Sequence, residues 1–107
     1  MKDSLSLLTL WAMIAMATPA LAADFKIIQK DKKFSESQIK INIGDQITFV
    51  NGDTVTHNVY STTPGFEFDL RTQAPEQSDT ILFRKAGIVE VQCAIHPKMR
   101  LRVDVTR

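Results

Sequence analysis

After residue 22, four side chains of this sequence can bind a soft metal ion, and three of them lie in one short segment. The segment is Cys93-x-x-His96-x-x-Met99, and the fourth side chain, His57, lies well upstream. Beyond residue 22 the chain has no other cysteine, histidine or methionine. The spacing predicts that His57, Cys93, His96 and Met99 converge on one metal ion.

Two imidazoles, one thiolate and one thioether are the ligand set of a type 1, or blue, copper site. In such a site the histidines and the cysteine surround the ion in a plane, and the methionine binds weakly along the axis. The soft thiolate suits Cu(I), imidazole suits both oxidation states, and the weak axial ligand raises the reduction potential. The four residues therefore predict a single copper ion that gains and loses one electron.

Zinc is the first alternative, but structural zinc sites are built from cysteine and histidine and rarely include methionine. Each residue alone also has a purely structural interpretation. Cys93 continues the apolar face of Val89 and Val91, Met99 could fill a gap in the core, and either histidine could lie on the surface. That all four are incidental at this spacing is the less favoured interpretation.

Short stretches with alternating apolar and polar side chains, separated by turn residues, must position these ligands. Such alternation is typical of half-buried strands, and no window after residue 22 has a helical period of useful length. About seven or eight short strands separated by turns predict an all-β antiparallel sandwich. The predicted strands are residues 24–29, 39–43, 46–50, 57–61, 66–70, 80–83, 88–93 and 101–105.

The first 22 residues have the features of an export signal. Lys2 precedes an apolar run over residues 5–17, and Pro19 is followed by the small-x-small sequence Ala20-Leu21-Ala22. The run is shorter than the roughly 20 residues that span a bilayer, so an uncleaved anchor is the weaker alternative. We expect residues 1–22 to be a signal peptide and residues 23–107 to be one periplasmic domain without stable membrane insertion.

Charge and cysteine content exclude several classes of protein. The chain has 13 basic and 12 acidic residues, a net charge of +1, whereas a nucleic-acid binder shows a strong basic excess. Its single cysteine rules out a disulfide within the chain. An unpaired thiol is unusual in an exported protein, and metal binding would explain it. We expect a monomer that binds no nucleic acid.

The motif Cys93-x-x-His96-x-x-Met99, together with the upstream His57-Asn58 pair, resembles the cupredoxins, the type 1 blue copper proteins. Among them it is most similar to small amicyanin-like and plastocyanin-like members. The resemblance covers most of the chain after residue 22. It includes the segment 44–51 leading to His57, and Phe83-x-x-x-Gly87 leading to Cys93.

This resemblance implies a Greek-key antiparallel β-sandwich with copper at one end, under the loop that carries Cys93, His96 and Met99. It implies that Asn58 braces this loop and helps to hydrogen-bond the Cys93 sulfur. It also implies that the ring edge of His96 reaches the surface and lets electrons pass. Ile95 and Lys98 depart from the amicyanin pattern, which has a proline and an aromatic residue there.

The expected function is single-electron transfer between protein redox partners by Cu(II)/Cu(I) cycling, without enzymatic activity. Copper storage or delivery is the alternative, although such proteins more often have methionine-rich or multiple-histidine segments. A copper enzyme would need an open coordination position or a second metal. A binding module with a degenerate site is disfavoured because all four ligands are present. Basic residues could form a docking rim for an acidic partner, or simply a solvated strand face; these are Arg84, Lys85, Lys98, Arg100 and Arg102.

Overall fold

The computed structural model describes residues 21–107, in which there are nine strands and no helix. Within this part of the chain no helix is therefore long and apolar enough to cross a membrane. The predicted signal segment lies almost entirely outside the described residues, so its cleavage stays a prediction. The all-β class predicted from the alternating pattern is confirmed.

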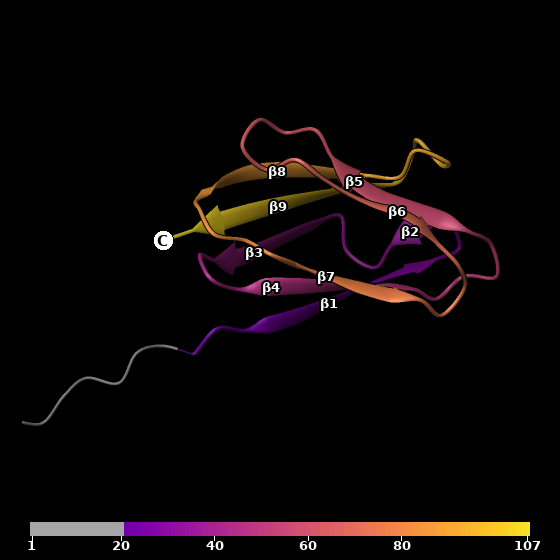
Figure 1. Ribbon diagram of the computed structural model, residues 1–107, viewed down its shortest axis with the longest axis horizontal. Coiled ribbons are helices and arrows are strands. Elements are labelled where there is room, and N and C mark those ends of the chain that lie inside the picture. The colour runs from indigo at the N-terminus through magenta and orange to yellow at the C-terminus, as the bar shows by residue number, and fades with distance from the viewer. Residues whose placement is uncertain (1–20) are drawn as a thin grey trace, which may run out of the picture.

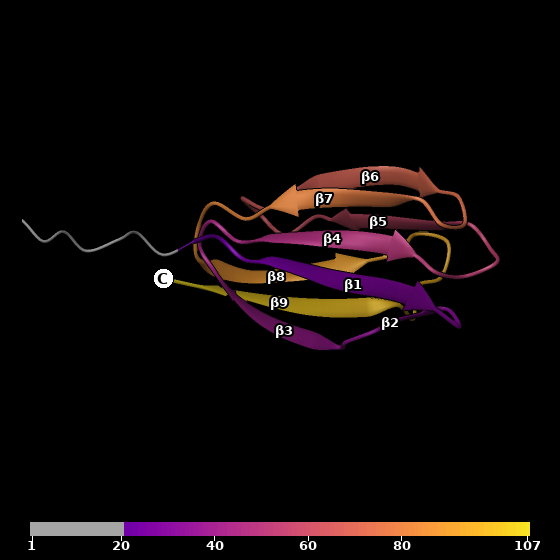
Figure 2. The ribbon, with the colours of Figure 1, turned by 90° about the horizontal axis from the view of Figure 1, so that it is seen from below.

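The nine strands form two sheets that pack face to face (Figures 1 and 2). The smaller sheet has the order β2 (Lys33–Phe34), β1 (Asp24–Lys30), β4 (Gln46–Asn51), β7 (Ser78–Leu82). The larger sheet has the order β3 (Gln38–Asn42), β9 (Arg100–Thr106), β8 (Gly87–Gln92), β5 (His57–Ser61), β6 (Phe68–Gln73).

Each sheet contains one parallel pair, so the sheets are mixed. Strand β1 runs parallel to β4, and β3 runs parallel to β9, whereas the remaining pairs are antiparallel. The chain leaves the first sheet after β2, forms β3 in the second sheet and returns as β4 beside β1. This crossover between layers makes neighbours of strands that run in the same direction. Side-chain alternation shows which face is buried, and it carries no information on strand direction.

The inward face of every central strand fills the space between the sheets. Along β8, Val89 and Val91 are fully buried and the residues beside them are not, as the period of two requires. Cys93 and Met99 belong to the same buried cluster, at its end. The metal-binding candidates therefore extend the hydrophobic core, which fixes their positions. Other large members of the cluster are Ile27, Phe34, Ile41, Ile47, Phe49, Phe83 and Leu101.

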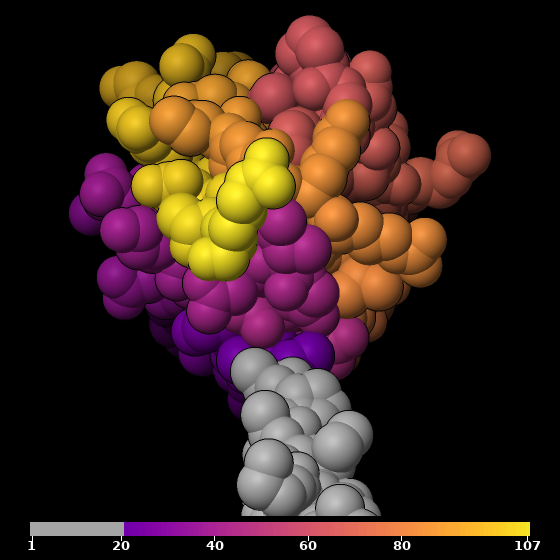
Figure 3. All heavy atoms as spheres, turned by 90° about the vertical axis from the view of Figure 1, so that its left-hand side faces the viewer, coloured from indigo at the N-terminus to yellow at the C-terminus, as the bar shows by residue number. Residues whose placement is uncertain are grey.

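The two ends of the sandwich differ in what they carry. Pairing of Gln92 with Arg100 places the 93–99 loop at one end, and pairing of Gly87 with Val105 places the chain's C-terminal residues at the other. Figure 3 views the molecule from this second end. Arg84 and Lys85 lie between the end of β7 and the start of β8 at Gly87, so they are at the end away from the 93–99 loop. Of the two interpretations left open for these residues, a docking rim beside that loop is therefore excluded for Arg84 and Lys85.

Candidate metal centre

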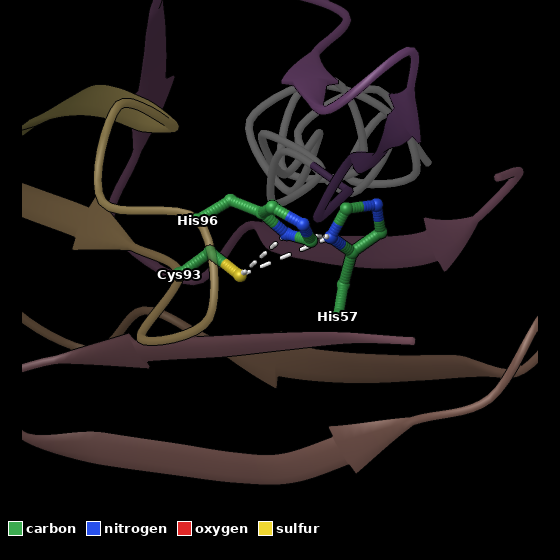
Figure 4. A group of neighbouring side chains, drawn as sticks. All are labelled: His57, Cys93 and His96. Carbon is green, nitrogen blue, oxygen red and sulfur yellow. Dashed lines mark hydrogen bonds between the residues drawn. The ribbon is translucent and has the colours of Figure 1, made fainter. Parts of the chain in front are cut away.

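Three of the four predicted ligands converge at the loop end of the sandwich (Figure 4). The Nδ1 atoms of His57 and His96 are 3.1 Å apart. The Cys93 sulfur lies 3.9 Å from Nδ1 of His57 and 4.0 Å from Nδ1 of His96. Metal–nitrogen and metal–thiolate bonds of about 2.0 and 2.3 Å, as for zinc, allow donor separations up to roughly 4 Å. One ion can therefore reach all three donor atoms.

Strands of the larger sheet bring these ligands together. His57 begins β5 and its side chain is fully buried, while Cys93 directly follows β8 and is 1% exposed. Strands β5 and β8 are neighbours, paired at Tyr60 and Gln92. Because the two strands are antiparallel, the start of β5 lies beside the end of β8. Two residues far apart in sequence thus meet on the same edge of the core.

His96 and Met99 come from the loop between β8 and β9. The Met99 N–H donates to the His96 carbonyl at 2.9 Å, which closes a tight turn and returns the chain to the start of β9. His96 is half-buried, whereas Met99 is 1% exposed and lies in the same buried cluster as Cys93. The loop therefore holds one imidazole toward the surface and one thioether within the core.

Asn58 braces the loop in the way the resemblance implied. Its backbone N–H lies 3.4 Å from the Cys93 sulfur, and its side-chain oxygen accepts a hydrogen bond from the Ala94 N–H at 3.2 Å. Its side-chain nitrogen donates to a carboxylate oxygen of Asp69 and to the Arg71 carbonyl, each at 2.9 Å. The prediction for this residue is confirmed.

Asp53 is a functional candidate that the sequence did not reveal. One of its carboxylate oxygens lies 2.7 Å from Nε2 of His57. The hydrogen bond from His57, with others from the Lys32 and Asp31 backbone N–H groups, lowers the pKa of Asp53 from 3.8 to about 2. In the sequence Asp53 is only the end of a turn signal, Asn51-Gly52-Asp53. An acid four residues before a histidine was the available clue.

The surface around His96 is a shallow and largely apolar recess of about 310 Å³. Its walls are Ile95 and Pro97, with Lys98 from the same loop and Lys32 from the β1–β2 turn. Ile95 is 47% exposed although it is apolar. A larger recess of about 420 Å³, which Phe66 and Lys85 help to line, lies toward the opposite end and contains no histidine or cysteine. The recess at His96 is thus the one next to the candidate ligands.

Comparison with known proteins decides the family. Residues 22–106 match the family model described as copper binding proteins, plastocyanin/azurin family. The chain belongs to this family: it is a cupredoxin. The two imidazoles and the buried thiolate, with Met99 in the same cluster, fit a type 1 copper ion, which is the cofactor of this cupredoxin.

Its relatives place the protein near the amicyanins. It is 33% identical to the methylamine utilization protein MauL of Methylorubrum extorquens, over 98% of this chain and 96% of that protein. It is 29% identical to amicyanin of Paracoccus denitrificans, over 68% of this chain and 58% of that protein.

Solved structures confirm the cupredoxin fold. The Cu(I) form of an amicyanin mutant matches with a TM-score of 0.73 at 22% identity, covering 80% of this chain and 85% of that one. A purple cupredoxin from Nitrosopumilus maritimus matches with a TM-score of 0.69 at 23% identity, covering 78% of this chain and all of that one.

Proposed function

We propose that this cupredoxin carries single electrons between protein redox partners, with His57, Cys93, His96 and Met99 holding one copper ion. The observation that carries the proposal is the meeting of two imidazole nitrogens and one thiolate within 4.0 Å of one another. When bound, copper supplies a one-electron couple, which none of the protein's own side chains provides. The protein contributes the surroundings of the ion, which set how fast electrons enter and leave the site.

Burial suits the site for fast electron exchange. His57 and Cys93 are 0% and 1% exposed, and both are fixed by packed strands, so their donor atoms stay in place when charge changes. Water is excluded from this side of the site. A rigid, dry ligand set needs little rearrangement between oxidation states, which is what a carrier requires.

His96 is the proposed point of entry and exit for electrons. It is half-buried and lines the recess beside Ile95 and Pro97, so its ring lies between the donor cluster and solvent. Lys32 and Lys98 add two positive charges to this surface. Complementary charge speeds the encounter of proteins, so we propose acidic protein partners that dock here.

The competing functions fit the site less well. Metal delivery requires ready release, and the near-complete burial of His57, Cys93 and Met99 hinders it. An oxidase or reductase would need further ligands for a second metal or an open position. Residues 21–107 contain no histidine or cysteine beyond the three that already converge. For location, we propose that residues 1–22 are removed on export and that the domain 23–107 works as a monomer in the periplasm.

The test is the colour and redox behaviour of purified protein loaded with Cu(II). We expect an intense blue or green colour from thiolate-to-copper charge transfer, bleached by mild reductant and restored over repeated cycles without loss of copper. Cys93→Ser should abolish the colour. Val91→Ala, a change at an equally buried neighbour on the same face, should keep it. A colourless complex, or a colour that survives Cys93→Ser, excludes the carrier function.

Transfer of copper to a chelator separates the carrier from the storage alternative. A carrier should retain its copper through many oxidation and reduction cycles in the presence of a moderate chelator. Loss of the metal at each reduction step would favour storage or delivery instead.

A further inference from the structure

The carboxylate of Asp53 connects a candidate copper ligand to a turn from another part of the chain. One oxygen accepts hydrogen bonds from Nε2 of His57 at 2.7 Å and from the Lys32 backbone N–H at 2.9 Å. The other oxygen accepts from the Asp31 backbone N–H at 3.0 Å. The Asp53 side chain is only 11% exposed. Three donors from two segments therefore converge on one largely buried acid.

The bond to Asp53 decides which nitrogen of His57 is available for metal. An ionised carboxylate can only accept, so the proton of the neutral ring must lie on Nε2. Nδ1 then carries the free lone pair, and Nδ1 is the atom that faces the Cys93 sulfur and His96. The ring is thus already in the tautomer and orientation that a metal ion needs.

The β1–β2 turn holds the Asp53 carboxylate in place. Asp31 and Lys32 have φ values of +53° and +57°, a left-handed conformation that is unfavourable for residues with a side chain. The two backbone N–H groups of this turn both point at the Asp53 carboxylate. The Asp53 N–H also donates to the Asn51 side chain at 2.9 Å, which fixes the loop from its own side. The acid is therefore anchored independently of His57.

We propose that Asp53 is a positioning residue of the copper site, which fixes the tautomer and ring orientation of His57 from a place set by the β1–β2 turn. This proposal rests on the function proposed above, because it requires His57 to be a ligand. A carboxylate bonded to the outer nitrogen of a ligand histidine makes that histidine a stronger donor. It also places negative charge near the ion, which favours Cu(II) over Cu(I).

Asp45 provides a matched control. It is also a buried aspartate that caps a turn. Its carboxylate oxygens accept hydrogen bonds from the backbone N–H groups of Ala23 and Asn42, each at 2.8 Å. It lies at the opposite end of the sandwich and touches no ligand. Asp53→Asn and Asp45→Asn therefore remove the same charge from similar turns, and only the first alters a hydrogen bond to a ligand.

The experiment compares these two variants in the copper-loaded protein. For Asp53→Asn we expect a loss of Cu(II) affinity of about 10-fold or more. We also expect a raised reduction potential and a shifted charge-transfer band. Asp45→Asn should change none of these three. If the two variants give the same potential, spectrum and affinity, Asp53 only caps a turn and the proposal fails.

The turn can be stabilised separately to isolate the effect on His57. Asn-Gly is the preferred pair for a two-residue turn with positive φ at both positions. In an Asp31→Asn/Lys32→Gly background, Asp53→Asn should lose little stability, yet the changes in potential and spectrum should persist. If this background cancels those changes, Asp53 acts through the turn alone and the proposal is overturned.

The ring tautomer itself can be observed without copper. In the ¹⁵N-labelled apo protein, two-bond nitrogen–proton correlations should show His57 entirely as the Nε2–H form, and as a mixture in Asp53→Asn. A wild-type ring protonated on Nδ1 would overturn the proposal, and this measurement needs no variant to fold. Loss of colour in the wild-type protein would instead contradict the proposed function.

Discussion

The backbone N–H of Asn58 lies 3.4 Å from the sulfur of Cys93, and the same residue's side chain accepts the N–H of Ala94, the residue that follows Cys93. One residue of β5 therefore holds both the sulfur and the start of the ligand loop. Hydrogen bonding around the cysteine sulfur is one of the factors that set the potential of a blue-copper site. Asn58 and Asp53 thus act on the site from two sides.

Replacing Asn58 by alanine should destabilise the protein. The change leaves the Ala94 N–H without its acceptor and removes the donor to Asp69 and to the Arg71 carbonyl. We expect the free energy of unfolding of the apo protein, measured in urea, to fall by about 1–3 kcal/mol. Asn42→Ala, at an exposed asparagine, should cost less than about 0.5 kcal/mol. Equal losses in the two variants would contradict a bracing role.

Removing copper should lower the melting temperature. A ligand that binds only the folded state stabilises it by about 2.7 kcal/mol when its free concentration is about 100 times Kd. For a domain of this size, that corresponds to about 10 °C or more. Calorimetry of the apo and copper-loaded forms measures the difference, and Cys93→Ser should abolish most of it. Equal melting of the two wild-type forms would argue against a preformed site.

Charge at the His96 recess should control reaction with small redox reagents. Lys98→Glu should slow oxidation of the reduced protein by an anionic oxidant such as hexacyanoferrate(III) several-fold at about 0.01 M salt, where the Debye length is about 30 Å. The effect should vanish at about 1 M salt, where the Debye length is about 3 Å. Stopped-flow rates provide the measurement. Arg84→Glu, an equal charge change at the far end, is the control, and an equal slowing there would refute docking at His96.

Acid should destabilise the protein partly through Asp45. The backbone N–H groups of Ala23 and Asn42 hold the pKa of this carboxyl below 3.8, its ordinary value. Because the pKa is lower in the folded state, the stabilisation is complete at pH values above the pKa of the unfolded state. It is lost as the pH falls through the pKa of the folded state. Below about pH 5, the free energy of unfolding measured in urea should therefore fall less steeply with decreasing pH in Asp45→Asn than in the wild type. The same slope in both would show that Asp45 does not contribute.

Local sequence patterns could predict the faces of the strands and the ligands. Alternation placed Val89, Val91 and Cys93 on one face of the strand predicted at residues 88–93, and all three are buried. The strand predicted at residues 66–70 is found as β6 (Phe68–Gln73), which starts slightly later and lies at the edge of the larger sheet. The convergence of His57 with Cys93 and His96 followed from the rarity of these residue types and from their spacing.

Relationships across the molecule could not be predicted in the same way. The two-residue strand β2 (Lys33–Phe34) is too short to show alternation, and it exists because it pairs with the end of β1. The two backbone partners of Asp53 come from a turn more than 20 residues away, and only the folded chain brings them together. For a related reason the sequence left the place of Arg84 open: nearness to a turn in sequence does not show which end of the sandwich that turn occupies.

The separation of the two ends has a practical consequence for handling the protein. The chain enters β1 at Asp24 beside the start of β4, and the C-terminal residues lie at this same end, far from the ligand loop (Figures 1 and 3). A linker added at either terminus would therefore leave the His96 face open. Protein immobilised on a surface through a C-terminal tag should present His96 to soluble partners in a single orientation.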